Sequence, residues 1–125
     1  MRRWTEEIIG AAIEVHRHLG PGLLEATYEE CLCHELQLRG LPFRRQVLVP
    51  LEYKGLHLED RHRVDVIVAD LVVVELKAIE TLLSVHHAQL LTYMRLGNWP
   101  LGLLINFHAA LLADGIHRKI LNRRE

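Results

Sequence analysis

The strongest constraint on the fold comes from two apolar runs, 63–68 and 71–77, which are separated by only two residues. Both runs are rich in β-branched residues, so they predict the two strands of an antiparallel hairpin. Because they are almost continuously apolar, we expect a sheet that is covered on both faces. Asp65, Glu75 and Lys77 interrupt this pattern. A buried charge is costly unless it is paired or binds a metal, so these three residues are the first candidates for a functional site.

The length of the loop between the two runs decides whether the two acids meet. With a turn centred on Asp70, Asp65 lies opposite Glu75, and directly opposed residues share a face with their Cβ atoms roughly 5 Å apart. With a two-residue turn, Asp65 opposes Val74 instead and Glu75 points to the other face, because a slip of one residue exchanges the faces. A shared site therefore requires an odd-numbered loop or a bulge.

Two interpretations of this cluster follow from the residue types. A pair of neighbouring carboxylates suits a hard divalent ion, Mg²⁺ or Mn²⁺, and Lys77 beside it would activate a water or stabilise charge on a phosphate. In the alternative, Lys77 and Arg63 neutralise Asp65 and Glu75 in a buried salt-bridge set that has no catalytic role. Residue spacing alone leaves both interpretations open.

Periodicity predicts the other elements of the chain. Helical spacing indicates a helix from Thr5 as N-cap to about Leu19, a second helix over about 24–39, and a third from Ser84 as N-cap to about 96. Further strands are expected at 46–53, where Pro50 suggests an edge or a bulge, and at 56–58 and 101–107. Segment 115–120 is compatible with a strand or a helix. The order predicts one α/β domain over residues 1–125, a mixed central β-sheet flanked by helices.

The charge balance argues against one class of protein. The net charge is −1 and the pI is about 6.8, whereas a tight non-specific nucleic-acid binder usually has a clear basic excess. Four groups of basic residues would suit a phosphate-binding rim or an ordinary solvated surface: Arg44-Arg45, Arg61 with Arg63, Arg118-Lys119 and Arg123-Arg124.

Cysteine, histidine and hydropathy patterns set further expectations. Cys31 and Cys33 are separated by one residue within a predicted helix, so we expect no disulfide between them. The contiguous group Cys31, Cys33 and His34 and the pair His86-His87 lack the usual spacing of zinc ligands. No apolar run approaches the 18 residues of a membrane span, and the N-terminus has no apolar signal segment, so we expect a cytoplasmic protein.

Several motifs resemble those of a known family. Asp65 followed by Glu75-Leu76-Lys77 resembles the D…(D/E)-x-K signature of the PD-(D/E)XK nuclease superfamily, although Val64 precedes the first acid where the name has proline. The segment from Gly22 to Tyr28, with Glu25 in its centre, resembles the G-x-x-E-x-x-Y motif of the GxxExxY protein family. Stretches 9–22, 74–77, 86–93 and 102–107 resemble that family as well.

The resemblance implies a fold, a site and an activity. It implies a restriction-endonuclease-like αβββαβ core, with Glu25, Asp65 and Glu75 as ligands of Mg²⁺ or Mn²⁺, Lys77 as the catalytic lysine and Gln89 as a further polar residue of the catalytic site. The implied activity is metal-dependent hydrolysis of phosphodiester bonds, with DNA or RNA as the partner. The alternative is a catalytically inactive nuclease-fold module that binds nucleic acid or a protein. The oligomeric state stays open, a homodimer included.

Overall fold

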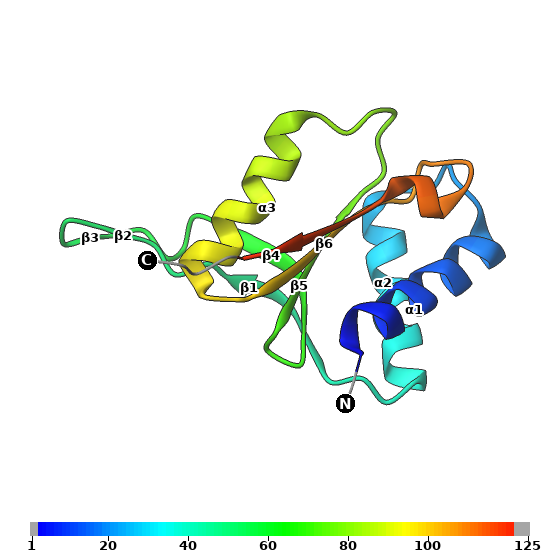
Figure 1. Ribbon diagram of the computed structural model, residues 1–125, viewed down its shortest axis with the longest axis horizontal. Helices are drawn as coiled ribbons and strands as arrows, with labels where there is room; N and C mark the ends of the chain where they lie inside the picture. Colours follow the sequence, from blue (N-terminus) through cyan, green and yellow to red (C-terminus); the bar gives the residue numbers. More distant parts are fainter. Residues whose placement is uncertain (1–2, 122–125) are drawn as a thin grey trace.

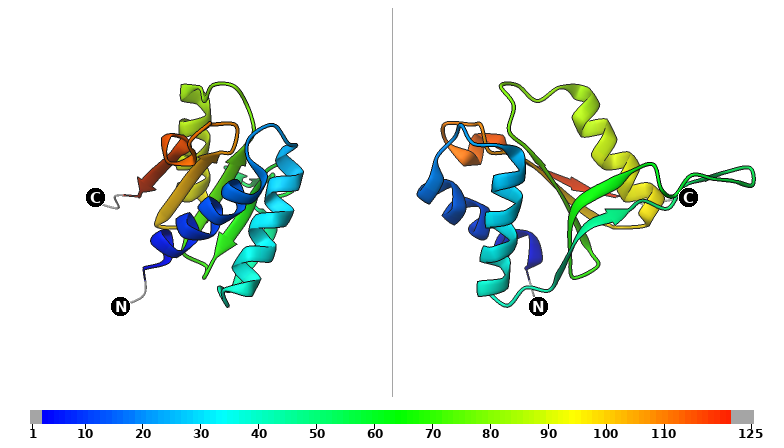
Figure 2. Two further views of the ribbon diagram at one scale, coloured as in Figure 1. Left: turned by 90° about the vertical axis from the view of Figure 1, so that its right-hand side faces the viewer. Right: turned by 180° about the vertical axis from the view of Figure 1, so that it is seen from behind.

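The computed structural model describes residues 3–121, which form a five-stranded sheet with helices on both faces (Figures 1 and 2). The strand order is β1-β4-β5-β6-β7; β5 and β6 are parallel and the other neighbours antiparallel. The sheet strands are β1 (Phe43–Leu48), β4 (Arg63–Val68), β5 (Val72–Lys77), β6 (Leu101–Asn106) and β7 (Ile116–Ile120). The helices are α1 (Trp4–Leu19), α2 (Glu25–Leu38), α3 (Ser84–Gly97) and the short 3₁₀ helix η1 (Leu112–Gly115). This architecture confirms the predicted mixed sheet flanked by helices.

Two apolar clusters cover the two faces of the sheet. On one face α1 and α2 pack against strand residues that include Val66, Val74 and Ile105, and against Phe107, which follows β6 directly. On the other face α3 packs against Val73 and Leu104. The strands are therefore buried on both sides, which explains the nearly continuous apolar runs of the sequence. Among residues 3–121, no helix combines the length and hydrophobicity needed to cross a membrane.

The helix boundaries differ from the predicted ones by about one residue. Helix α1 begins at Trp4 with Arg3 at the N-cap, so Thr5 lies inside the helix and does not cap it. Helix α3 has Leu83 at the N-cap, and Ser84 is its first helical residue. The backbone N–H of Leu83 is bonded by His86 Nδ1, at 2.9 Å. A side chain from the first turn of the helix therefore satisfies the N-cap amide, and Ser84 does not cap the helix.

The predicted strand over 46–53 is divided in two. Its first part belongs to β1, and its last two residues form β2 (Glu52–Tyr53), which pairs with β3 (Leu56–His57) in a separate hairpin. Pro50 lies between the two parts, where it interrupts no ladder hydrogen bond. The hairpin projects from the main sheet, at the far side from α1 and α2 (Figure 1). The undecided segment 115–120 is mainly strand β7, and Cys31 and Cys33 are both free.

Candidate active site

The loop between β4 and β5 sets the register that brings the two acids to the same level. The loop has three residues, 69–71, and the paired residues of the two strands lie symmetrically about Asp70. This places Asp65 level with Glu75. The loop is therefore odd-numbered, as a shared site requires.

Beyond the pair Val66–Val74, the backbone ladder between β4 and β5 stops and side chains replace it. The backbone N–H of Asp65 donates to Glu75 Oε1 at 3.1 Å, and the N–H of Leu76 donates to Asp65 Oδ2 at 2.8 Å. Each carboxylate thus bonds to the backbone of the opposite strand. The strands separate at this point without leaving these amides unsatisfied, and the two acids share the opening.

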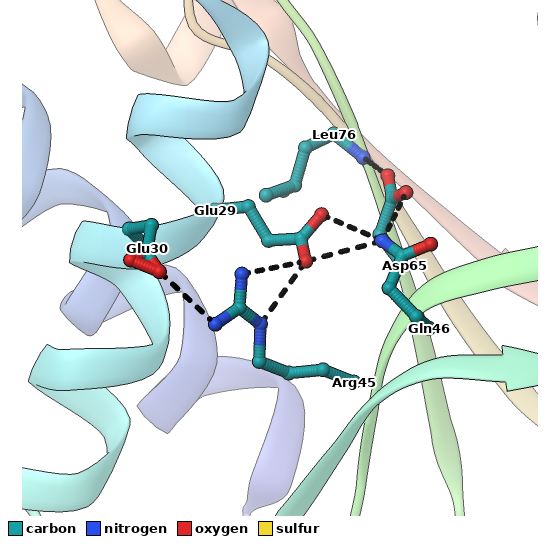
Figure 3. A network of polar contacts seen from close by, with 6 residues as sticks. All are labelled: Glu29, Glu30, Arg45, Gln46, Asp65 and Leu76. Carbon is teal, nitrogen blue, oxygen red and sulfur yellow. Dashed lines mark hydrogen bonds and ion pairs between the residues drawn. The ribbon is translucent and has the colours of Figure 1, made fainter.

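Side-chain alternation along β4 breaks at Asp65. Val64 packs in the α3 cluster and Val66 in the α1/α2 cluster, whereas residues two apart on a regular strand share a face. On the neighbouring strand, Gln46 has a φ of 51°, which is uncommon for a residue other than glycine. Because of this irregularity, Asp65 bonds to β5 with one oxygen and lies 3.5 Å from Gln46 Nε2 with the other (Figure 3).

The predicted site residues from α2, β4 and β5 share one electrostatic environment. Burial raises the pKa of Glu75 to about 8, and the negative charge of Asp65 adds to the rise. Burial also raises the pKa of Asp65, and burial and then the charge of Asp65 raise that of Glu25, the first residue of α2. The Lys77 ammonium lowers all three values. Full ionisation of these acids is therefore unfavourable in the absence of a further cation.

Comparison with known proteins identifies the family to which the chain belongs. A family model described as the PD-(D/E)XK nuclease superfamily matches residues 2–119. The chain belongs to the PD-(D/E)XK nuclease superfamily. No curated protein and no solved structure matches it. The mixed sheet with its flanking helices agrees with the restriction-endonuclease-like fold of that superfamily.

Gln89 of the PD-(D/E)XK signature set is joined by a hydrogen bond to Tyr93, also a residue of α3. It is an exposed residue of α3 whose Nε2 donates to Tyr93 Oη at 3.0 Å, and within residues 3–121 no hydrogen bond joins it to Glu75. Tyr93 Oη also lies 3.0 Å from His62 Nδ1. Burial and then the charge of Glu75 raise the pKa of Tyr93. Tyr93 therefore contacts Gln89 and also lies within electrostatic range of Glu75 and Asp65.

Sequence analysis missed a second polar group of the PD-(D/E)XK site, centred on Glu29 of α2. Glu29 is 6 % exposed, and its carboxylate accepts hydrogen bonds from Arg45 Nε at 3.1 Å and from Gln46 Nε2 at 3.0 Å (Figure 3). Gln46 Nε2 faces Asp65 as well, so it connects the two acids. The sequence does contain a signal that could have identified Glu29. Glu29 lies four residues after Glu25, a spacing that places both glutamates on the same face of a helix.

The donor set fits a hard divalent cation, although the side chains are not arranged around one. Among residues 3–121, no three His, Cys, Asp or Glu residues are close enough to hold an ion together. Glu25, Asp65 and Glu75 nevertheless offer only carboxylate oxygens, the ligands that Mg²⁺ and Mn²⁺ prefer. Burial is the largest cause of their raised pKa values, so the ionised forms are costly at this position. A bound cation would stabilise those ionised forms.

Proposed function

We propose that this PD-(D/E)XK protein is a metal-dependent nuclease that hydrolyses phosphodiester bonds in DNA or RNA. In this proposal Glu25, Asp65 and Glu75 hold Mg²⁺ or Mn²⁺. The main support is that Asp65 and Glu75 meet where β4 and β5 separate, with the pKa values of both raised and with Lys77 beside them. A structural ion pair would instead stabilise the charged forms of the two acids.

Each side chain has a defined task in this proposal. A bound metal ion would supply a polarised water and would neutralise phosphate charge. Lys77 stabilises the negative charge that develops on the phosphate. Because the pKa of Glu75 is raised to about 8, this acid keeps its proton at neutral pH and must release it when a cation binds. Metal affinity should therefore increase as the pH rises. Gln89 would act on the substrate side of the site through its bond to Tyr93.

Two observations favour the alternative, a non-catalytic module that binds nucleic acid or a protein. Asp65 and Glu75 already bond to backbone amides, so the site is stable as a structural feature. The net charge of −1 is also low for an enzyme that must hold a polyanion. The same experiment tests both functions.

The experiment is a nuclease screen over single- and double-stranded DNA and RNA with several divalent ions, combined with thermal unfolding. The native protein, Asp65→Asn and Asp70→Asn are compared; the control removes an exposed carboxylate from the turn of the same hairpin. We expect Mg²⁺ or Mn²⁺ to raise the Tm of the native protein and of Asp70→Asn, but not of Asp65→Asn. Cleavage should follow the same pattern. An equal rise of Tm in all three proteins would exclude the metal site.

A further inference from the structure

Several arginines form ion pairs with carboxylates, namely Arg3, Arg17, Arg39, Arg44, Arg45 and Arg61. Within residues 3–121 no ion pair with a carboxylate is made by His87 on α3 or by His117 and Lys119 on β7. Arg95 and Arg118 also lack such a partner there, so what distinguishes these three residues is that they lie close together.

These side chains converge between α3 and β7. The rings of His87 on α3 and His117 on β7 meet edge to face, with centroids 4.9 Å apart. Lys119 lies two residues after His117, so both project from the same face of β7. Lys119 pairs with Gly102 on β6. A Cβ atom at Gly102 would point toward Leu90 and Met94 of α3.

The electrostatics of His87 agree with this arrangement. Burial lowers the pKa of His87, and the positive charges of Lys119, His117 and His86 lower it further. These three are the charged groups recorded around the His87 ring, and all are cationic when protonated. His86 belongs to the first turn of α3, where the helix dipole adds positive potential. The position therefore favours a negatively charged ligand.

The sheet register places this cluster in one row with the acidic centre. Glu75 pairs with Leu104, and Leu104 pairs with His117. Leu104 packs in the α3 cluster, as does Val73, so regular alternation puts Glu75 on that face too. Two strand spacings separate Glu75 from His117, a distance of about 10 Å. Neighbouring phosphates of a stacked strand lie further apart than the axial rise of roughly 3.4 Å per nucleotide, because the backbone also winds around the axis, so this distance corresponds to about one or two nucleotides.

We propose that His86, His87, His117 and Lys119 form a phosphate-binding subsite that holds the nucleic-acid backbone about one or two nucleotides from the acidic centre. The subsite rests on the proposed function, because it describes how the same substrate is held. It also accounts for the near-neutral net charge, since a local group of unpaired cations can hold a backbone without a basic excess over the whole surface.

The test measures binding of a short single-stranded oligonucleotide by fluorescence anisotropy, without divalent ions so that cleavage does not interfere. The full chain is compared with Lys119→Gln, His117→Gln and Lys54→Gln. The last variant removes a cation from the projecting hairpin and is the matched control. We expect Lys119→Gln to weaken binding about 3- to 10-fold and to reduce the slope of log K against log salt by roughly 0.7. Lys54→Gln should change neither.

The pH dependence gives a second readout. Binding to the native protein should tighten as the pH falls toward about 6, because a bound phosphate stabilises protonated His87. In His117→Gln, which loses the ring that contacts His87, this tightening should be smaller. Equal weakening in Lys119→Gln and Lys54→Gln, unchanged binding in Lys119→Gln, or no binding at all would each overturn the subsite.

The outcomes separate the subsite from the catalytic proposal. If the native protein cleaves but Lys119→Gln binds like the native protein, the subsite is wrong and the nuclease proposal stands. If Lys119→Gln binds more weakly than the control variant but no metal supports cleavage, the subsite stands and the catalytic proposal is wrong.

Discussion

The two halves of the β4–β5 hairpin are built from the same kind of sequence but serve different ends. Near the turn, Val66–Val68 and Val72–Val74 form a regular ladder, and all six residues are buried. Beyond them the ladder stops and the carboxylates of Asp65 and Glu75 take its hydrogen bonds. The half near the turn stabilises the fold. The other half holds two acids with raised pKa values where β4 and β5 separate. The comparison shows that the site begins where backbone pairing ends.

Lys77→Ala should give the largest effect, a loss of cleavage. This effect should be confined to the half of the hairpin that holds Asp65 and Glu75. Lys77 is half-buried at the end of β5, and its positive charge acts on Glu25, Asp65 and Glu75. Loss of one stabilising charge from an active site typically reduces the rate by roughly 10²- to 10⁴-fold. We therefore expect cleavage under the best screening conditions to fall by that factor, while Mg²⁺ still raises the Tm. Lys77→Ala with native activity would remove the lysine from the mechanism.

Glu75→Gln should change stability in a pH-dependent way. The pKa of Glu75 is raised from 4.5 to about 8, so the folded state binds more protons than the unfolded state between these values. Native stability should therefore be fully present below about pH 4.5 and should decrease as the pH rises through 8. Gln keeps the acceptor for the Asp65 N–H and removes the charge. In metal-free buffer the variant should be more stable than the native protein at pH 8.5, on the order of a few kcal/mol, and nearly equal at pH 5.

Chemical denaturation at the two pH values checks this expectation. Glu80→Gln is the control, since Glu80 is an exposed carboxylate only a few residues along the chain. The control should show the same difference from the native protein at both pH values. A constant difference for Glu75→Gln would mean that Glu75 is ionised in the folded state, and the argument for a missing cation would then fail.

The sequence predicted the parts of this hairpin that depend on local pattern. The β-branched runs predicted β4 and β5, and the anomaly of charges within them identified Asp65, Glu75 and Lys77. The sequence left the register of β4 against β5 open, because that register changes when the loop is one residue longer or shorter. The loop conformation was also not predictable, since Ala69 and Asp70 take positive φ values that their residue types do not demand.

The residues that were missed depend on tertiary contacts. Glu29 lies on a helix of ordinary polar composition, and it contacts Arg45 and Gln46 on β1, the next strand along the chain. Helical spacing predicts that Leu38 faces inward, but Leu38 is the last residue of α2 and is 69 % exposed. Gln89 was identified by family resemblance alone, and the structure joins it to Tyr93 rather than to the acids. Periodicity carries no information about such pairings.

Val74→Ala should give the smallest effect and the clearest contrast with Glu75→Gln one residue later. Val74 is fully buried in the α1/α2 cluster, and loss of its two methyl groups should destabilise the protein by about 2 kcal/mol. Because no titrating group is removed, this loss should be the same at pH 5 and pH 8.5, and Mg²⁺ should still stabilise the variant. Denaturation curves with and without Mg²⁺ test both points. If the loss varied with pH as it does for Glu75, the two halves of the hairpin would share one electrostatic unit, and the boundary between them at Val66 and Val74 would have to be abandoned.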